Sequence, residues 1–350
     1  MKKKVAALLA TLMVGTAAGS ACLASNIIIN GTFDARYSNA NDKGMYNFAP
    51  DLTKKSGFYH RADINLIAPV SKDVSFIGSL FAGSRHASST ADRLDNTSVT
   101  LAMIVAKKGN AEYHIGRLAF QQGLGLTATT PYFDGASVGY KADKLTTTVV
   151  AGNTFITTYN PAVAVDDQIN SGNHNFIGID AAYDVDKDKK IIATLWQDED
   201  KDVYKTVTMG YKQTINKDWV ASGEYGQNNS TLAKDRNGGS AAKAYFARIK
   251  YQGADPEKVG SSGVSLTYIK ADPYFDPCSD TLLESTPNGW NFPTNGANID
   301  NTKGVVVSYE QTVFDKTVFK VNYAPVKRVK DMNGVPENRS YVTADLIIHF

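Results

Sequence analysis

The sequence predicts one all-β domain, a transmembrane antiparallel β-barrel of about sixteen strands, and three observations predict it. Polar and apolar residues alternate with period two from Ile27 to the C-terminus. The links between the alternating stretches are short and long in turn, and tyrosines recur near the ends of the stretches. The composition, with 43% hydrophobic and 21% charged residues and only 2 Cys, excludes a collagen-like, disulfide-rich or disordered chain.

The N-terminus has the layout of a secretory signal peptide. Three lysines at positions 2–4 precede an apolar run from Val5 to Val14, and small residues follow as far as Ala24. We expect residues 1–24 to be a signal peptide cleaved after Ala21 or Ala24, and residues 25–350 to be the barrel. Loss of the three lysines leaves 34 basic against 35 acidic residues, so the mature net charge is near −1 and nucleic acid is not an expected partner.

An alternative makes Cys22 a lipid-modified first residue, although Gly19 stands where such a signal usually has Leu or Val. If cleavage follows Ala24, Cys278 is the only cysteine left and no intrachain disulfide can form. Beyond the signal, no apolar run reaches the roughly 18 residues that a spanning helix needs. A membrane role therefore requires strands.

Apolar and charged residues separate most clearly between positions 58 and 70. Phe58, Ala62 and Ile64 lie on one face of this stretch, and Arg61 and Asp63 lie on the other, because successive strand side chains point in opposite directions. The same pattern predicts strands near 26–37, 58–70, 74–83, 97–107, 111–118, 135–141, 145–153, 173–183, 190–197, 203–212, 219–227, 242–251, 263–270, 303–312, 317–325 and 339–350.

The links between these strands follow a rhythm. Links after even-numbered strands are mostly short, as at 71–73, 108–110, 142–144 and 313–316. Links after odd-numbered strands are mostly long, as at 38–57, 84–96, 119–134, 154–172, 228–241 and 271–302. A barrel with short turns on one rim and long loops on the other predicts this alternation, and a soluble sandwich does not.

Aromatic residues mark two opposite rims on the apolar face. Rings with an apolar body and a polar tip settle where hydrocarbon meets lipid headgroups. The general preference of Tyr for strands explains their number but not their repeated terminal position. One rim comprises Tyr140, Tyr183, Tyr211, Tyr251, Tyr309 and Phe350, and the other comprises Tyr37, Tyr225, Tyr268 and Tyr323.

The C-terminal stretch from Tyr341 to Phe350 ends in Phe and has an apolar residue at every second place before it, namely Ile348, Leu346, Ala344 and Val342. In this respect the chain resembles the porin family of Gram-negative outer membranes. The resemblance covers essentially the whole mature chain. It implies that the last strand closes against the first and that the outer-membrane insertion machinery reads Phe350.

The resemblance also implies a function. It suggests export through the periplasm to the outer membrane, contact with outer-membrane lipid, and a water-filled channel for passive diffusion of small hydrophilic solutes and ions. Sixteen-stranded members commonly form homotrimers, and the small outward residues Gly31, Gly78 and Gly223 either line a subunit contact or relieve wall curvature. The alternatives are a non-conducting structural or adhesive barrel that displays its loops, and a secreted soluble β-protein.

Closure and an open lumen follow from physical arguments as well. Each unpaired backbone N–H or C=O group costs several kcal/mol in hydrocarbon, so a spanning sheet must have no free edge. Eight strands fill a barrel with their own side chains, whereas sixteen to eighteen leave a watery lumen. No segment large enough for a separate plug is left over from the predicted wall.

The loop after the fifth strand is the candidate constriction. In sixteen-stranded porins this loop typically folds inward, and here it spans Ala119 to Asp134. It is polar and nearly uncharged, which argues against strong cation selectivity. The alternative is an external loop that stays outside the lumen. The candidate constriction residues are Gln121, Gln122, Thr127, Thr129, Tyr132 and Asp134.

Charged residues that alternate with apolar outward positions are candidates for the pore lining. A charge on the lipid face near the membrane midplane would cost about 2–4 kcal/mol, so these side chains should point inward. Asp34 with Arg36 and Arg61 with Asp63 lie on neighbouring strands and form either a field-producing ladder or a set of mutually compensating charges. The candidates are Asp34, Arg36, Arg61, Asp63, Glu112, Glu224, Arg248, Lys250, Glu310, Lys320 and Asp345.

Nothing in the sequence predicts catalysis, a metal site or a cofactor. The histidines show no Ser/His/Asp or metal-ligand spacing. The acidic stretch from Asp184 to Asp188 lacks the Gly and the closing Glu of a calcium loop and is expected to be a turn. The five histidines are His60, His86, His114, His174 and His349.

Overall fold

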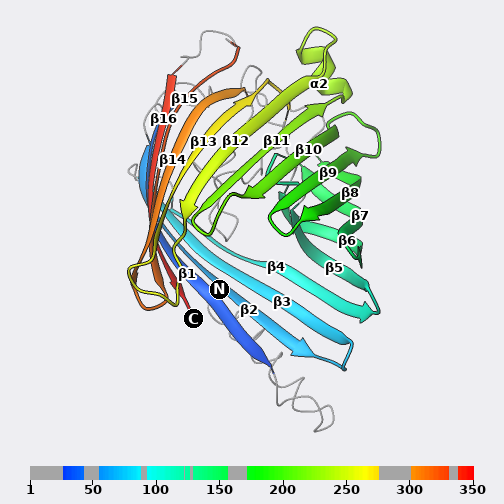
Figure 1. Cartoon of the computed structure of the whole chain (residues 1–350), viewed down its shortest axis with the longest axis vertical. Coiled ribbons are helices and arrows are strands. Elements are labelled where there is room, and N and C mark those ends of the chain that lie inside the picture. The colour runs from blue at the N-terminus through cyan, green and yellow to red at the C-terminus, as the bar shows by residue number, and fades with distance from the viewer. Residues whose placement is uncertain are drawn as a thin grey trace.

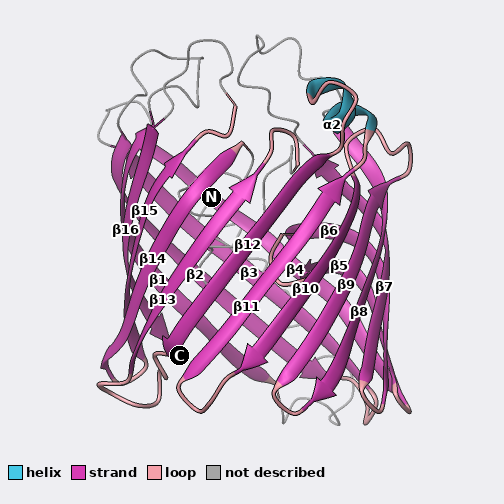
Figure 2. Ribbon diagram, turned by 45° about the horizontal axis from the view of Figure 1, so that its top comes forward, coloured by secondary structure: helices cyan, strands magenta, loops and turns pink. Residues whose placement is uncertain are grey.

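The computed structural model describes residues 27–42, 55–87, 93–121, 123–126, 129–156, 172–275, 301–330 and 338–350. Each strand pairs antiparallel with its neighbour in the chain, and the first pairs with the last, so the sheet closes into a barrel (Figures 1 and 2). The strands are β1 (Ile28–Asp42), β2 (Lys55–Pro69), β3 (Val74–Ala87), β4 (Arg93–Lys108), β5 (Ala111–Gln121), β6 (Thr129–Ala142), β7 (Leu145–Ile156), β8 (Gly172–Asp186), β9 (Lys189–Asp198), β10 (Lys205–Thr214), β11 (Trp219–Asn228), β12 (Ala242–Gln252), β13 (Ser262–Ala271), β14 (Thr302–Phe314), β15 (Thr317–Lys327) and β16 (Asn338–His349).

The predicted fold class is confirmed, and each of the sixteen predicted strands has a counterpart in the barrel. Several strands are longer than predicted at the rim that carries the long links. β4 begins at Arg93, β5 continues to Gln121 and β6 begins at Thr129. Beyond the apolar belt both faces of a strand meet water, so the polarity contrast that reveals a strand in sequence fades while the hydrogen-bonded ladder continues.

The two rims differ as predicted (Figure 2). Tight turns at 109–110, 143–144 and 187–188 join even-numbered strands to the next, although the link 253–261 is longer. Gly109 and Asp143 have φ of 61° and 45°, the left-handed conformation that a reversal of this kind needs. The opposite rim carries the short helix α2 (Thr231–Arg236), capped by Ser230, whose side chain accepts a hydrogen bond from the N–H of Ala233 at 3.2 Å.

The outer face of the wall is apolar and exposed. Ile104, Ile115 and Met209 expose 53%, 63% and 63% of their surface, whereas Asp34 and Asp345 on the inner face are buried. Adjacent residues of a strand thus face opposite environments. Among the helices of the described residues, none is both long and apolar enough to cross a membrane.

The barrel closes where β1 meets β16. Gly31 and Phe350 exchange two backbone hydrogen bonds, Gly31 N to Phe350 O at 2.9 Å and Phe350 N to Gly31 O at 3.1 Å. A Cβ on Gly31 would lie 2.1 Å from the carbonyl oxygen of Asp63 and 2.7 Å from the Phe350 ring. The seam therefore requires glycine at this position because the neighbouring strand and the terminal ring already occupy the space.

Gly31→Ala should lower the free energy of unfolding by about 1–3 kcal/mol because the added methyl must displace backbone as well as the terminal ring. Urea titration of protein refolded into lipid vesicles, followed by tryptophan fluorescence, measures the change. Gly139→Ala is the matched control, since a Cβ there meets nothing closer than 3.8 Å. Equal stability of the two variants would contradict the requirement for glycine at the seam.

Candidate functional site

The inner wall on either side of the seam carries a band of charges that alternate in sign. Four of them are Arg36 on β1, Asp345 on β16, Lys320 on β15 and Glu310 on β14. Glu310 lies directly opposite Lys320, Lys320 opposite Asp345, and Asp345 opposite Arg36 in the strand register. Opposite charges therefore face each other across three successive strand pairs.

Further contacts extend the band in both directions. On one side, Lys250 Nζ of β12 lies 2.7 Å from Glu310 Oε1, across the intervening strand β13. At the seam, Arg36 Nε contacts Asp345 Oδ1, and Arg36 Nη2 lies 3.9 Å from Asp34 Oδ2.

On β2 the last two charges form a bidentate pair. Arg61 donates to Asp63 through Nε at 2.5 Å and Nη2 at 2.7 Å, and Asp34 lies opposite Arg61 in the register. The structure thus brings together eight of the predicted lining residues, and their formal charges cancel. The band consists of Lys250, Glu310, Lys320, Asp345, Arg36, Asp34, Arg61 and Asp63.

Accessibility divides this band into two parts. Asp34, Arg36 and Asp345 at the seam are almost inaccessible, as are Arg61 and Asp63. The side chains of Lys250 and Glu310 are 40% and 22% exposed. Charges that are paired and removed from water act on a solute only through their summed field, whereas Lys250 and Glu310 can contact it directly.

Two other predicted lining residues also point inward. Arg248 donates from Nε to Thr267 Oγ1 at 2.8 Å. Glu112, near the short-turn rim, lies 2.9 Å from Lys107 Nζ and 2.7 Å from His114 Nε2. Lys107 and His114 were not among the predicted lining residues, although their positions in the period-two pattern match that of Glu112.

A segment of the chain between β5 and β6, residues Gly123 to Leu126, lies inside the barrel. It reaches across to the inner faces of β8 and β11, where carboxylates hold its backbone. The N–H of Gly123 donates to Asp180 at 2.8 Å. The N–H groups of Leu124 and Leu126 both donate to Glu224, at 3.0 and 2.9 Å. Of the two open alternatives, the structure therefore favours the inward loop for these four residues.

Glu224, a predicted lining residue, lies on the inner face of β11, where the segment covers it. The side chain is 3% exposed and also accepts a hydrogen bond from Thr208 Oγ1 at 2.5 Å. Asp180 in turn accepts from Thr194 Oγ1 at 2.6 Å. Because a buried carboxylate needs hydrogen-bond donors, this arrangement fixes the segment against the wall rather than presenting Glu224 to the lumen water.

The predicted loop from Ala119 to Asp134 is shorter than expected, since part of it belongs to β5 and β6. Asp134 is wrongly placed in that loop: it lies on β6 and faces outward, because its neighbour Phe133 is buried on the inner face. Asp134 makes a bidentate pair with Arg117 on β5, with both distances 2.8 Å.

For the other five candidate constriction residues, the structure does not describe where the side chain lies. Three have strand backbone, and their side chains lie outside what the structure describes: Gln121, Thr129 and Tyr132. Gln122 and Thr127 lie outside the described residues altogether, as do the predicted signal peptide and Cys278.

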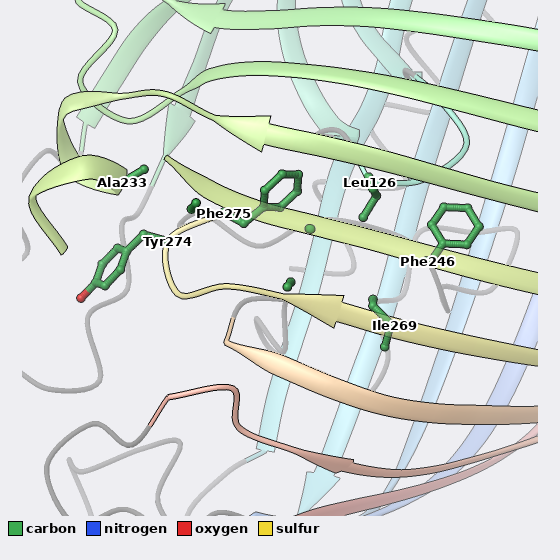
Figure 3. Close-up of a cluster of buried hydrophobic side chains, with 9 residues drawn as sticks. Leu126, Ala233, Phe246, Ile269, Tyr274 and Phe275 are labelled. Carbon is green, nitrogen blue, oxygen red and sulfur yellow. The ribbon is translucent and has the colours of Figure 1, made fainter. Parts of the chain in front are cut away.

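The inner wall beside this segment is partly apolar, in contrast to the charged lining that the sequence predicts. Leu126 packs against Phe246, Ile269 and Phe275 in a buried cluster on the inner side of β12 and β13 (Figure 3). The close-up also shows Ala233 of α2 and Tyr274 toward the long-loop rim.

A second apolar cluster lines the inner faces of β5 to β9 and includes Phe133, Phe176 and Trp196. The rings of Phe176 and Trp196 stack with centroids 4.6 Å apart. The signal for this cluster was present in the sequence, because these aromatic residues occupy the positions that are polar elsewhere along the strands. Together with residues 123–126, the two clusters cover parts of the inner wall between β5 and β13.

Metal binding finds no support in the described part of the chain, where no group of three or more His, Cys, Asp or Glu side chains is placed to hold an ion. The described inner wall carries mutually neutralising charges and an anchored segment with apolar packing.

Comparison with known proteins identifies the fold. No family model matches the chain and no curated protein matches it in sequence. The barrel is similar to OccK11 (OpdR) of Pseudomonas aeruginosa, with 12% identity, a TM-score of 0.56, and coverage of 92% of this chain and 96% of that one.

Two further structures give a similar result. OccK8 (OprE) of Pseudomonas aeruginosa has 11% identity and a TM-score of 0.56 over 94% of this chain and 99% of its own. A mutant of the porin of Rhodopseudomonas blastica has 9% identity and a TM-score of 0.55 over 93% of this chain and 100% of its own. At these identities the likeness shows that the chain has the porin fold.

Glu224→Ala should release residues 123–126 from the wall. It removes the acceptor of two charge-assisted hydrogen bonds, each worth about 1.5–3 kcal/mol, so the amides of Leu124 and Leu126 should exchange with solvent at least about tenfold faster. Hydrogen exchange resolved by mass spectrometry measures this.

Glu224→Gln is the matched control, because its amide oxygen can still accept from both N–H groups and its NH₂ can donate to Thr208. Exchange in the alanine variant that is as slow as in the wild type would show that the apolar packing alone holds the segment.

Proposed function

We propose that the protein is an outer-membrane porin, a water-filled channel for the passive diffusion of small hydrophilic solutes and ions. The observation that carries the proposal is the division of a closed sixteen-stranded wall into an exposed apolar outer face and a charged inner face. A barrel of this width leaves room for water unless it is plugged. The porin fold of the matched structures adds support.

The outer face supports a membrane location. Large apolar side chains are exposed on it around the barrel, for example Ile104, Val207 and Leu266. Such a continuous belt would be unfavourable in water and is what lipid tails require. This argues against the alternative of a secreted soluble β-protein. The long-loop rim is proposed to face the exterior, after export directed by residues 1–24 and insertion directed by Phe350.

The inner face supports passive diffusion rather than binding or chemistry. The charges of the band cancel, and Glu224 and Asp180 are used by the backbone of residues 123–126. Because the eight charges of the band cancel and residues 123–126 cover Glu224, we expect weak selectivity between small cations and anions. Catalysis is not part of the proposal.

Assembly as a homotrimer is also proposed, on the resemblance alone. Gly31 supplies no argument for a subunit contact, because the seam already requires glycine there. Gly223 has a similar local reason, since a Cβ would lie 3.0 Å from the carbonyl oxygen of Phe246.

Single-channel recording of refolded mature protein in a planar bilayer tests the proposal. We expect stepwise conductance and, under a salt gradient, a reversal potential near zero, because the wall charges compensate one another. Protein that is inserted and heat-modifiable but passes no current would contradict the diffusion channel and favour the non-conducting, loop-displaying barrel. Failure to insert would favour the soluble alternative.

The accessible pair Lys250 and Glu310 offers a test of charge compensation with two opposite variants. Lys250→Gln leaves Glu310 without this partner and should raise the ratio of cation to anion permeability roughly twofold, whereas Glu310→Gln should lower it by a similar factor. Reversal potentials measure both. Lys205→Gln, on the outer face, is the control; permeability ratios that move in the same direction in both lumen variants would disprove the compensation.

A further inference from the structure

We propose that the outer wall over β10 to β14 carries a specific site for a phosphorylated membrane lipid, with its acyl chains in an apolar groove and its phosphate at Lys270 and Lys303. The inference goes beyond diffusion through the lumen and depends on the proposed membrane location. Three features of the outer face carry it: the groove, the directly opposed lysines at one end of it and the aromatic or neutral outward residues of β10 to β14 at the other.

The groove is a concave part of the lipid-facing surface with a volume of about 920 Å³. Its floor is made of small outward residues, Ala221, Gly223 and Ala247, and bulky side chains such as Met209 and Tyr268 form its sides. Small residues flanked by large ones leave a recess that flexible acyl chains can fill and that a flat wall would not have.

Lysines stand at the long-loop end of the groove. Lys270 lies two residues after the groove residue Tyr268 on β13, and Lys303 lies two residues before the groove residue Val305 on β14. Each lysine therefore shares the outward face with its groove residue. The two lysines are directly opposite each other in the register of β13 and β14, and Lys327 of β15 is opposite Lys303.

Like charges placed directly opposite destabilise a sheet unless an anion lies between them. Among the described residues, Lys270 and Lys303 have no acidic side chain within ion-pair distance. A phosphate group supplies the missing counter-charge, and its oxygens accept hydrogen bonds from ammonium groups. Lys243 on β12, two residues beyond the groove residue Tyr245, adds a further exposed cation at the same rim.

At the short-turn end of the same face, the outward strand residues differ in charge from those at the long-loop end. On β10 to β14 the outward strand residues there are aromatic or neutral, including Trp219, Tyr251 and Tyr309. The lysines at that rim either lie on links, as Lys217 and Lys258 do, or have an acidic partner, as Lys189 has in Asp186 at 3.1 Å. The lysines therefore favour an anionic headgroup in the leaflet at the long-loop rim. They also disfavour a second copy of the chain as the occupant of the groove, because a copy inserted in the same direction would bring its own lysines to the same height.

Lipid titration of the full refolded chain in a neutral detergent, followed by native mass spectrometry, tests the site. The probes are lipid A, phosphatidic acid, phosphatidylcholine and inorganic phosphate. We expect saturable binding of the two lipids with phosphate monoesters, binding of phosphatidylcholine at least tenfold weaker, and inorganic phosphate unable to displace bound lipid. Equal binding of all three lipids, or displacement by inorganic phosphate, would overturn the proposal.

Variants separate the two halves of the site. The double variant Lys270→Gln/Lys303→Gln should weaken binding of the phosphorylated lipids about tenfold without changing that of phosphatidylcholine. Ala247→Phe, which fills the groove, should weaken binding of all three lipids. The matched control, Lys217→Gln/Lys258→Gln, changes two exposed lysines on links at the short-turn rim and should have no effect.

Unchanged affinity in the double lysine variant, or dimers in place of lipid adducts, would overturn the lipid site. Planar-bilayer conductance of the same preparations distinguishes this failure from failure of the proposed function. Channels that conduct normally but bind no lipid specifically would remove only the lipid site, whereas loss of insertion would remove both.

Discussion

The structure depends on the need to pair every backbone N–H and C=O group of a sheet that is surrounded by hydrocarbon. Water is absent there, so a free edge would leave a row of unsatisfied groups. The exchange of hydrogen bonds between Gly31 and Phe350 removes that edge. The need for glycine at position 31 and the placement of the C-terminal ring against it both follow from the closeness of strands at this seam.

Closure also determines where polar chemistry can exist. With lipid outside, charges can be accommodated only within, and the register of the strands brings them together in pairs of opposite sign. The seam is where this compensation is densest, since Arg36 contacts both Asp345 of the last strand and Asp34 of its own strand. The same ion pairs that balance the charge of the lumen therefore connect the two ends of the chain.

The opposite side of the lumen is organised by a different interaction. Backbone N–H groups of Leu124 and Leu126 share one carboxylate, Glu224, and apolar side chains of the same segment pack on the wall beneath. A loop held in this way narrows the channel without contributing fixed charge. The permeation path proposed for this protein thus runs between a neutralised ionic wall and an anchored, largely uncharged one.

The sequence by itself determined the number and order of the strands, the difference between the rims and the direction in which most charged side chains point, because period-two polarity records which face of each strand meets lipid. It could not show which charges meet, since the contact between Lys250 and Glu310 spans a strand and depends on register. Nor could it reveal that Glu224 holds residues 123–126, that Asp134 faces outward or that aromatic residues pack inside the lumen. These features depend on contacts between segments far apart in the chain, and only the closed barrel brings those segments together.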